Sequence, residues 1–311
     1  MTTKSVVSLT AASVLLLTAA LFSTRAWAQG SLTPPGAPAP TMKTLEQMEP
    51  RVPISTAPFT ISQSGSYYLT TNLTVAAGNA ITIAADGVTL DLNGFTISST
   101  ANPAAGYAVL INSGLRNIAI QNGVIQGAVT YSGGVFSGSG FGYGISYSGT
   151  APQNVRVSGV SVSGCQYDAI SIGTGESTLV ENCVVRTAGG YGIMATTIRG
   201  CVARECGGTA INGNQVSDSR GETVGSGYGL YASRAAQNCY GVSSSGTGLY
   251  AYRTAIGCYG YSTSGTAGLY AQNANTCVGY RSSGTAIQAT IANGCWAAAG
   301  TNSITYKYNM P

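Results

Sequence analysis

The chain has 311 residues, of which 14 are basic, 10 are acidic and none is histidine, giving a net charge of +4. A positive charge this weak and scattered argues against a nucleic-acid partner. The lack of histidine excludes imidazole metal sites and histidine-dependent nucleophile systems. Charged residues make up only 8% of the chain, but a hydrophobic content of 44% is too high for a flexible linker.

Residues 1–28 have the pattern of a secretory signal peptide. Lys4 precedes an apolar run from Val6 to Phe22, and residues 26–28 read A-W-A, a cleavage signal. The run is short for a membrane span, and no second long apolar run follows. We therefore expect cleavage after Ala28 and a secreted, periplasmic or extracellular protein with no membrane span.

Residues 29–75 are expected to lead into the fold and to cap it. Residues 29–42 contain four prolines and predict an extended leader. In residues 43–75, Thr44–Gln47 matches a capping box, which predicts a short helix ending at Pro50. Phe59–Ile61 and Tyr67–Leu69 flank a Ser-Gly turn and predict a hairpin. A helix and hairpin here would cover the open end of a solenoid.

Residues 76–311 carry the pattern of stacked, half-buried strands. Ile81 and Ile83 alternate with polar neighbours, as do Val88 and Leu90. The Gly- and Ser-rich stretch 132–144 is expected to leave the coils as a loop.

A repeat of 18 to 20 residues dominates the C-terminal half. The sequence Gly-Leu-Tyr-Ala occurs at residues 229–232, 248–251 and 268–271. Cysteines recur every 18 or 19 residues at Cys239, Cys258, Cys277 and Cys295. Three more continue the series upstream, namely Cys165, Cys183 and Cys201. A fixed period of this size predicts a solenoid in which each repeat is one turn.

The residue types select one kind of solenoid. Leucine-rich repeats need leucine at several fixed positions, and left-handed β-helices need a six-residue apolar period; neither pattern is present. We therefore predict an all-β, right-handed parallel β-helix of about ten coils. The residue before each periodic cysteine is mostly Asn or Gly, which tolerate the left-handed backbone conformation that a repeated corner requires.

The N-terminal part of this region also resembles a known family. The sequence TPPGAPAPTMKTLEQMEPRVPIS, then FTISQSGSYYL, then ITIAADGVTLDLNGFTI resembles the opening of secreted bacterial right-handed β-helix proteins of the pectin-lyase-like superfamily. The resemblance implies a fold and not an activity, since the superfamily contains lyases, hydrolases, isomerases and binding proteins.

One candidate site follows from aligning the coils on the cysteine series. Three residues after each marker lie Asp168, Arg186, Arg204 and, counted from Ser219, Glu222. In a parallel stack these residues would form one column, about 4.8 Å apart. Lyases of the pectate type use an Arg or Lys base with Ca²⁺ held by carboxylates, so Arg186 and Arg204 are candidate bases and the two acids candidate ligands. The alternative is a surface ladder of ion pairs, and no cofactor is expected outside the lyase interpretation.

The cysteine column has three interpretations. The first is an inward stack of free thiols, which behave as small buried hydrophobes. The second is disulfide pairing between neighbouring coils, which export and the coil spacing permit. The third, a zinc site, fits poorly because the cysteines would lie in a line. Cys206 is off the register.

The tyrosines give a second candidate site. Alternation in Gly-Leu-Tyr-Ala points Leu and Ala inward and Tyr231, Tyr250 and Tyr270 outward, with Tyr252 further along the same face. Exposed aromatic rings with polar tips suit stacking against sugars, although a tyrosine column also stabilises a parallel sheet.

We therefore predict a secreted, non-catalytic solenoid that binds a polysaccharide or a cell-envelope surface. The alternatives are a polysaccharide lyase with an arginine base and a purely structural spacer.

Overall fold

The computed structural model describes residues 50–175 and 177–310. Pro50–Pro311 form one compact unit, and the secondary structure of its described residues consists of strands. The signal peptide, the leader and the helix expected before Pro50 lie outside the described residues. Among the described residues, no helix is long and apolar enough to cross a membrane.

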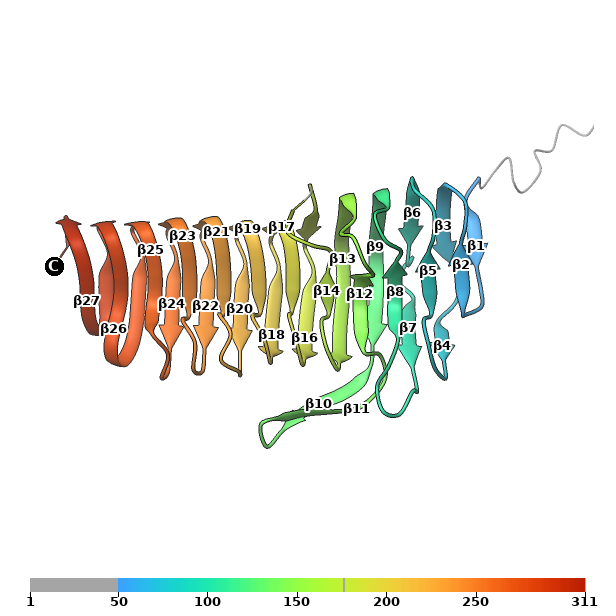
Figure 1. The fold of residues 1–311 in the computed structure, drawn as a ribbon, viewed down its shortest axis with the longest axis horizontal. Coiled ribbons are helices and arrows are strands. Elements are labelled where there is room, and N and C mark those ends of the chain that lie inside the picture. The colour runs from blue at the N-terminus through green and yellow to red at the C-terminus, as the bar shows by residue number, and fades with distance from the viewer. Residues whose placement is uncertain (1–49, 176, 311) are drawn as a thin grey trace, which may run out of the picture. The chain divides into compact units, whose positions relative to one another are not determined.

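The strands build a parallel β-solenoid of about 13 turns (Figure 1). A full turn passes through three runs of strand, which we call face I, face II and face III in the order in which the chain meets them from residue 59 onward. Each face pairs in parallel with the same face of the next turn, as in the pairing of β21, β23 and β25. This confirms the predicted all-β parallel solenoid.

Five strands lie on face I alone: β2 (Phe59–Ile61), β5 (Ile81–Ile83), β8 (Tyr107–Ile111), β12 (Tyr143–Tyr147) and β14 (Ile170–Ser171). Four lie on face II alone: β1 (Val52–Ile54), β3 (Gly65–Leu69), β6 (Val88–Asp91) and β15 (Leu179–Glu181). Seven lie on face III alone: β4 (Leu73–Val75), β7 (Thr96–Ser99), β16 (Val184–Ala188), β18 (Val202–Cys206), β20 (Arg220–Thr223), β22 (Tyr240–Ser243) and β24 (Tyr259–Ser262).

Longer strands bend from one face into the next. Five pass from face I into face II: β17 (Ile193–Arg199), β19 (Ile211–Ser217), β21 (Leu230–Gln237), β23 (Leu249–Ile256) and β25 (Ala267–Asn275). Two pass from face II into face III: β9 (Arg116–Gln126) and β13 (Gln153–Cys165). Two run through all three faces: β26 (Val278–Asn293) and β27 (Trp296–Tyr308).

The hairpin predicted for residues 59–69 is wrong. Strand β2 pairs in parallel with β5, while β3 pairs in parallel with β1 and β6, so the two segments belong to different faces. Residues expected to cap the solenoid therefore form its early turns, which helps to explain why about 13 turns exceed the ten predicted.

The expected excursion near residues 132–144 is present as an ordered hairpin. Strands β10 (Ala128–Ser132) and β11 (Val135–Ser139) pair antiparallel around a Gly133-Gly134 turn, and Figure 1 shows them leaving the stacked coils. The amide Nε2 of Gln166 donates to the carbonyl oxygen of Phe136 at 3.0 Å. This hydrogen bond ties the hairpin to the body of the solenoid.

The core becomes thinner along the chain. Early turns bury Ile and Leu on all three faces, such as Ile83 and Leu90. Later turns keep one large aliphatic side chain on face I, such as Leu249, and otherwise bury mostly Ala, Gly and Cys. Gly268 shows how close the faces come there: a Cβ on it would lie 2.5 Å from the oxygen and 2.7 Å from the nitrogen of Tyr280, and 2.8 Å from the oxygen of Ala286. Glycine is needed at this position because the backbones themselves are in contact.

The corner between face II and face III uses the left-handed conformation expected from the sequence. The residues before the periodic cysteines with positive φ are Asn182 (52°), Gly200 (61°), Asn238 (52°), Gly257 (60°), Thr276 (49°) and Gly294 (59°). The prediction for this corner is confirmed, although Thr276 is β-branched and tolerates the conformation poorly.

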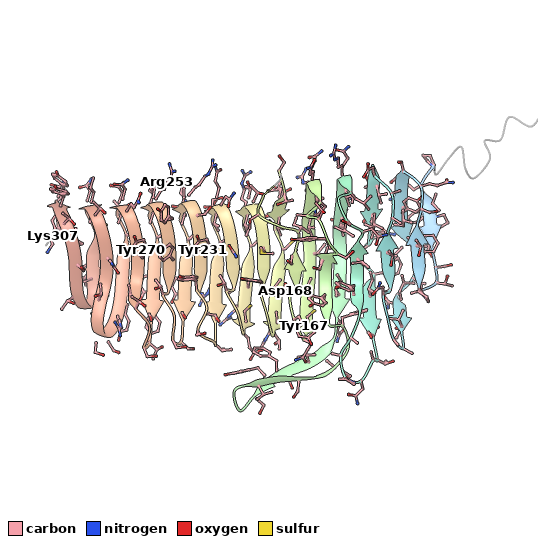
Figure 2. The ribbon with its side chains drawn as sticks, viewed as in Figure 1. Tyr167, Asp168, Tyr231, Arg253, Tyr270 and Lys307 are labelled. Carbon is pink, nitrogen blue, oxygen red and sulfur yellow. The ribbon has the colours of Figure 1, made fainter. Side chains whose placement is uncertain are left out.

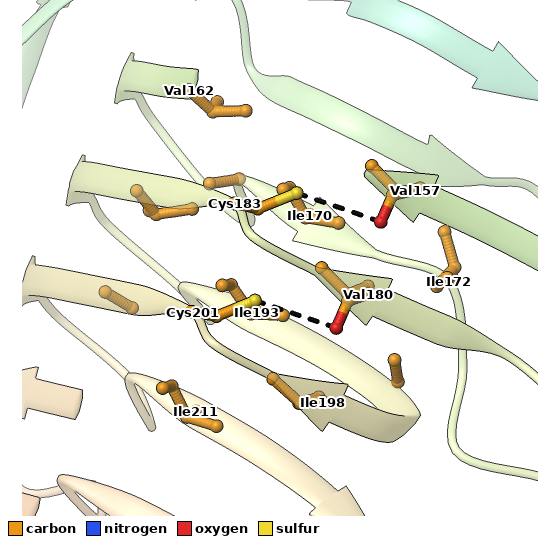
Figure 3. Close-up of a cluster of buried hydrophobic side chains, with 14 of the residues drawn as sticks. Val157, Val162, Ile170, Ile172, Val180, Cys183, Ile193, Ile198, Cys201 and Ile211 are labelled. Atoms are coloured by element: carbon orange, nitrogen blue, oxygen red, sulfur yellow. Dashed lines mark hydrogen bonds between the residues drawn. The ribbon is translucent and has the colours of Figure 1, made fainter. Parts of the chain in front are cut away.

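The cysteine column follows this corner, with one correction. Cys183 and Cys201 lie in successive turns, and their thiols donate to the carbonyl oxygens of Val157 and Val180 at 3.8 and 3.6 Å (Figure 3). Cys165 is not in this column, because it pairs with Ala188 on face III. All eight cysteines are free and buried, as in the first interpretation of the column.

The last described turn differs from the others in its inward positions. Ile287 of β26 pairs with Asn302 of β27, and the fully buried Ala292 pairs with Lys307. Two positions that are apolar in β26 are therefore polar or charged in β27, and Lys307 lies at this end of the stacked coils (Figure 2).

Candidate functional site

The tyrosine column lies on face I in the predicted register. Tyr231 pairs with Tyr250, and Tyr250 pairs with Tyr270; Figure 2 marks the first and last of the three, with the turn that carries Tyr250 between them. The column also contains Ser171, Met194 and Asn212 before the tyrosines and Gln288 after them. Because the repeat has an unbroken local period here, the sequence was sufficient to place these residues.

The three rings stack on one another. The ring centroids of Tyr231 and Tyr250 are 5.4 Å apart, and those of Tyr250 and Tyr270 are 4.4 Å apart with an interplanar angle of 8°. Tyr228 packs against both Tyr231 and Tyr250. Burial raises the pKa of Tyr250 to about 12, and the neighbouring Tyr270 contributes to the same shift. The faces of the inner rings are therefore covered by other tyrosines, and sugar stacking needs an uncovered face.

At the C-terminal end of the stack, the outer face of the Tyr270 ring has no tyrosine over it. Beyond it, the column continues with Gln288 and then Ser303, which have no aromatic ring. A hollow of about 280 Å³ opens at this point. Its lining consists of Tyr270, Ala271, Gln288, Ala289, Thr290, Ser303, Ile304 and Thr305. One aromatic face thus borders a cavity surrounded by an amide and several hydroxyl groups.

Tyr252 does not belong to the stack. It is 46% exposed, and the register between β23 and β25 shifts between Ala251 and Thr254, next to this residue. It projects as a separate side chain, so the sequence was right about its exposure but could not show that it is apart from the other rings.

The arginine column lies on face III, with members that differ from those expected. Arg186 pairs with Arg204 in the next turn, and the residue before Arg186 in the column is Ser163. The Nε atom of Arg204 lies 2.9 Å from a carboxylate oxygen of Glu222, which also pairs with Arg220. Both candidate bases have carboxylate partners, since Arg186 Nε lies 3.9 Å from Glu205.

Asp168 is not part of this column, which corrects the sequence alignment of the coils. It lies in the corner that leads into face I, beside Tyr167 (Figure 2). Its Oδ1 accepts the backbone N–H of Tyr191 at 2.8 Å, and burial raises the pKa of its carboxyl group. The alignment fails because Cys165, its marker, is on face III and not at the corner.

The metal candidates from the sequence were Asp168 and Glu222, which lie on different parts of the turn. Within residues 50–175 and 177–310, no three His, Cys, Asp or Glu side chains gather closely enough to hold a metal ion.

Face III also contains a backbone irregularity that the sequence did not reveal. Thr187 in β16 and Glu205 in β18 have φ of 59° and 56°, and Gly164 occupies the equivalent position in β13 with φ of 70°. A left-handed backbone costs a residue with a Cβ roughly 1–2 kcal/mol. Gly164 has no Cβ and adopts this conformation without that cost, but Thr187 and Glu205 hold strained conformations side by side.

Comparisons with known proteins add a fold likeness. No family model and no curated protein matches the chain. Two solved structures are similar. ORF18 of Geobacillus virus E2 is 11% identical over 80% of this chain and 53% of that chain, with a TM-score of 0.45. The enzymatically active domain of tailspike protein 2 of bacteriophage CBA120 is 15% identical over 79% of this chain and 41% of that chain, with a TM-score of 0.32. The chain spans about half the length of the first and less than half of the second. The likeness to the pectin-lyase-like superfamily remains a prediction.

Proposed function

We propose that this protein is a secreted, non-catalytic solenoid that binds a polysaccharide on face I. The observation that supports this most is the free ring face of Tyr270 beside a hollow with polar walls. A sugar ring has an apolar face that stacks on an aromatic ring and hydroxyl groups that need donors and acceptors. The amide of Gln288 and the hydroxyls of Thr290 and Ser303 supply both.

The position of the hollow favours a polymer as the ligand. Its lining comes from three successive turns on the strand face of the solenoid. An internal segment of a chain can therefore cross the hollow without a free end entering it. The predicted signal peptide supports a location outside the cytoplasm, where such polymers are met.

The lyase alternative has less support. The guanidinium groups of Arg186 and Arg204 each lie beside a carboxylate, Glu205 and Glu222, which is the arrangement of a surface ladder of ion pairs. Calcium-dependent release of an unsaturated product from a uronate polymer would support a lyase in spite of this.

Affinity electrophoresis of residues 29–311 through gels containing plant, algal and bacterial polysaccharides tests the proposal. We expect one polymer to retard the protein, and Tyr270→Ala to weaken this affinity about tenfold through loss of the stacking face. Tyr231→Ala is the matched control, because it removes the ring at the other end of the stack, which does not line the hollow. Absence of retardation by every polymer would favour a structural spacer, and an equal loss in both variants would show that the end face of Tyr270 is not the site.

A further inference from the structure

The irregularity on face III changes which side chains reach the surface. In a regular strand, alternation would turn Glu205 inward, because Arg204 points outward. The left-handed conformation at Glu205 breaks the alternation, so Arg204 is exposed and Glu205 is half-buried while Cys206 returns to the core. Two residues of β18, Arg204 and Glu205, lie opposite the single position of Glu222 in β20. The bulge thus brings a carboxylate to the surface beside two guanidinium groups.

Local contacts hold this arrangement in place. The hydroxyl of Thr187 donates to Glu205, and Arg186 lies near the same carboxylate oxygen. Strained backbone of this kind persists only where its surroundings enforce it, and it gathers at ligand sites. The same register position in β13 is Gly164, so the strain begins only where the charged residues begin.

A hollow of about 360 Å³ lies over these residues. Its principal lining residues are Arg186, Arg204, Glu205, Glu222, Val242 and Ser244. Two guanidinium groups and two carboxylates balance in charge, a serine hydroxyl adds a further polar group, and the valine supplies an apolar patch. The side chain of Arg186 is 76% exposed, so most of its donors face solvent.

The β10–β11 hairpin stands beside this region. Phe136 lies so close to Gly207 that a Cβ there would come within 2.8 Å of its ring atom Cε2. Gly207 is two residues beyond Glu205 in the chain, so the hairpin covers the solenoid next to the bulge and leaves the hollow itself open.

We propose that this hollow on face III is a second carbohydrate-binding site, which takes a neutral sugar residue. Glu205 accepts hydrogen bonds from neighbouring sugar hydroxyls, the fork of Arg186 donates to sugar oxygens, and Val242 contacts the apolar face of the ring. An acidic sugar is disfavoured because its carboxylate would meet Glu205 and Glu222. The site is independent of the face I site, since the two share no residue.

Saturation-transfer NMR with cellohexaose, mannohexaose and xylohexaose as neutral probes and trigalacturonate as the acidic probe tests the site. We expect at least one neutral hexasaccharide to bind residues 29–311 and to bind Tyr270→Ala, and Arg186→Ala and Glu205→Gln each to weaken that binding about tenfold. Arg156→Ala is the matched control, because this arginine also pairs with a glutamate at the surface but lies outside the hollow. Thermal melts by circular dichroism confirm that each variant is folded.

The outcomes separate the two sites. Loss of binding in Arg186→Ala and Glu205→Gln, with retention in Tyr270→Ala and Arg156→Ala, supports the face III site. The proposal is overturned if no neutral probe binds, if trigalacturonate binds best, or if binding by Tyr270→Ala survives the addition of each face III substitution. Loss in Tyr270→Ala alone would overturn it while supporting the face I site.

Discussion

Replacing Gly268 by alanine tests the close approach of the faces. The new Cβ would lie 2.5–2.8 Å from three backbone atoms, which belong to Tyr280 and Ala286. Carbon atoms do not approach backbone this closely, so the turn must open. Tyr280 is held by the ladder to Tyr261 in the preceding turn, which limits how far it can move. We therefore expect the upper end of the usual overpacking cost, about 3 kcal/mol.

For a domain of this size, that cost lowers Tm by roughly 6–12 °C. The assay is thermal unfolding followed by circular dichroism, with Gly175→Ala as the control. A Cβ on Gly175 would have no heavy atom within 4 Å, so this variant should match the wild type or gain slightly from the stiffer unfolded chain. If Gly268→Ala melts together with Gly175→Ala, the faces are not in backbone contact and the reasoning is refuted.

Three other predictions use the same physical arguments. Thr276→Gly should raise the free energy of unfolding by about 1 kcal/mol, because the exposed threonine has φ of 49°. Thr290→Gly, in an ordinary strand, is the control and should lower the free energy of unfolding. Urea titration measures both, and destabilisation by Thr276→Gly would contradict the left-handed backbone assigned to this residue. Burial raises the pKa of Cys165 from 9.0 to about 12, so the unfolded chain loses this proton first, and the free energy of unfolding should fall as pH rises from 9 through 12. In urea titrations, Cys165→Ala should make this fall less steep. An unchanged slope in the variant would contradict the prediction. Phe136→Ala should speed cleavage within residues 130–137 by a broad-specificity protease while leaving Tm nearly unchanged. Equal cleavage rates for the variant and the wild type would show that the ring does not hold the hairpin.

The sequence was sufficient to predict the architecture and the tyrosine column. The Gly-Leu-Tyr-Ala repeats lie 19 and 20 residues apart and share one alternation, so aligning them places Tyr231, Tyr250 and Tyr270 correctly. It could not show how the rings are oriented. Two tyrosines in a column may stack or splay, and only the stack leaves Tyr270 with the free face.

The arginine column shows where counting fails. Cys165 precedes Cys183 by the same interval that separates later cysteines, yet it belongs to face III. The left-handed residues of that face, such as Thr187, shift the alternation by one residue without any change in spacing. Thr and Glu are poor candidates for this conformation, so the sequence does not reveal it. Asp168 is misplaced for a different reason: the turn from Cys165 to its partner Ala188 has 23 residues, whereas the turn from Ala188 to Cys206 has 18, so counting by 18 assigns Asp168 to the wrong column.

The polar inward positions of β27 bear on how copies of this protein can assemble. A second solenoid stacked end-on against β27 would enclose the ammonium group of Lys307 in the space that Ala292 fills one turn earlier. Removing an unpaired ammonium from water costs several kcal/mol, and this cost opposes the hydrogen bonds gained along the strand edge. A strand layer placed over β27 would therefore meet a charged inward position that the preceding turn does not present.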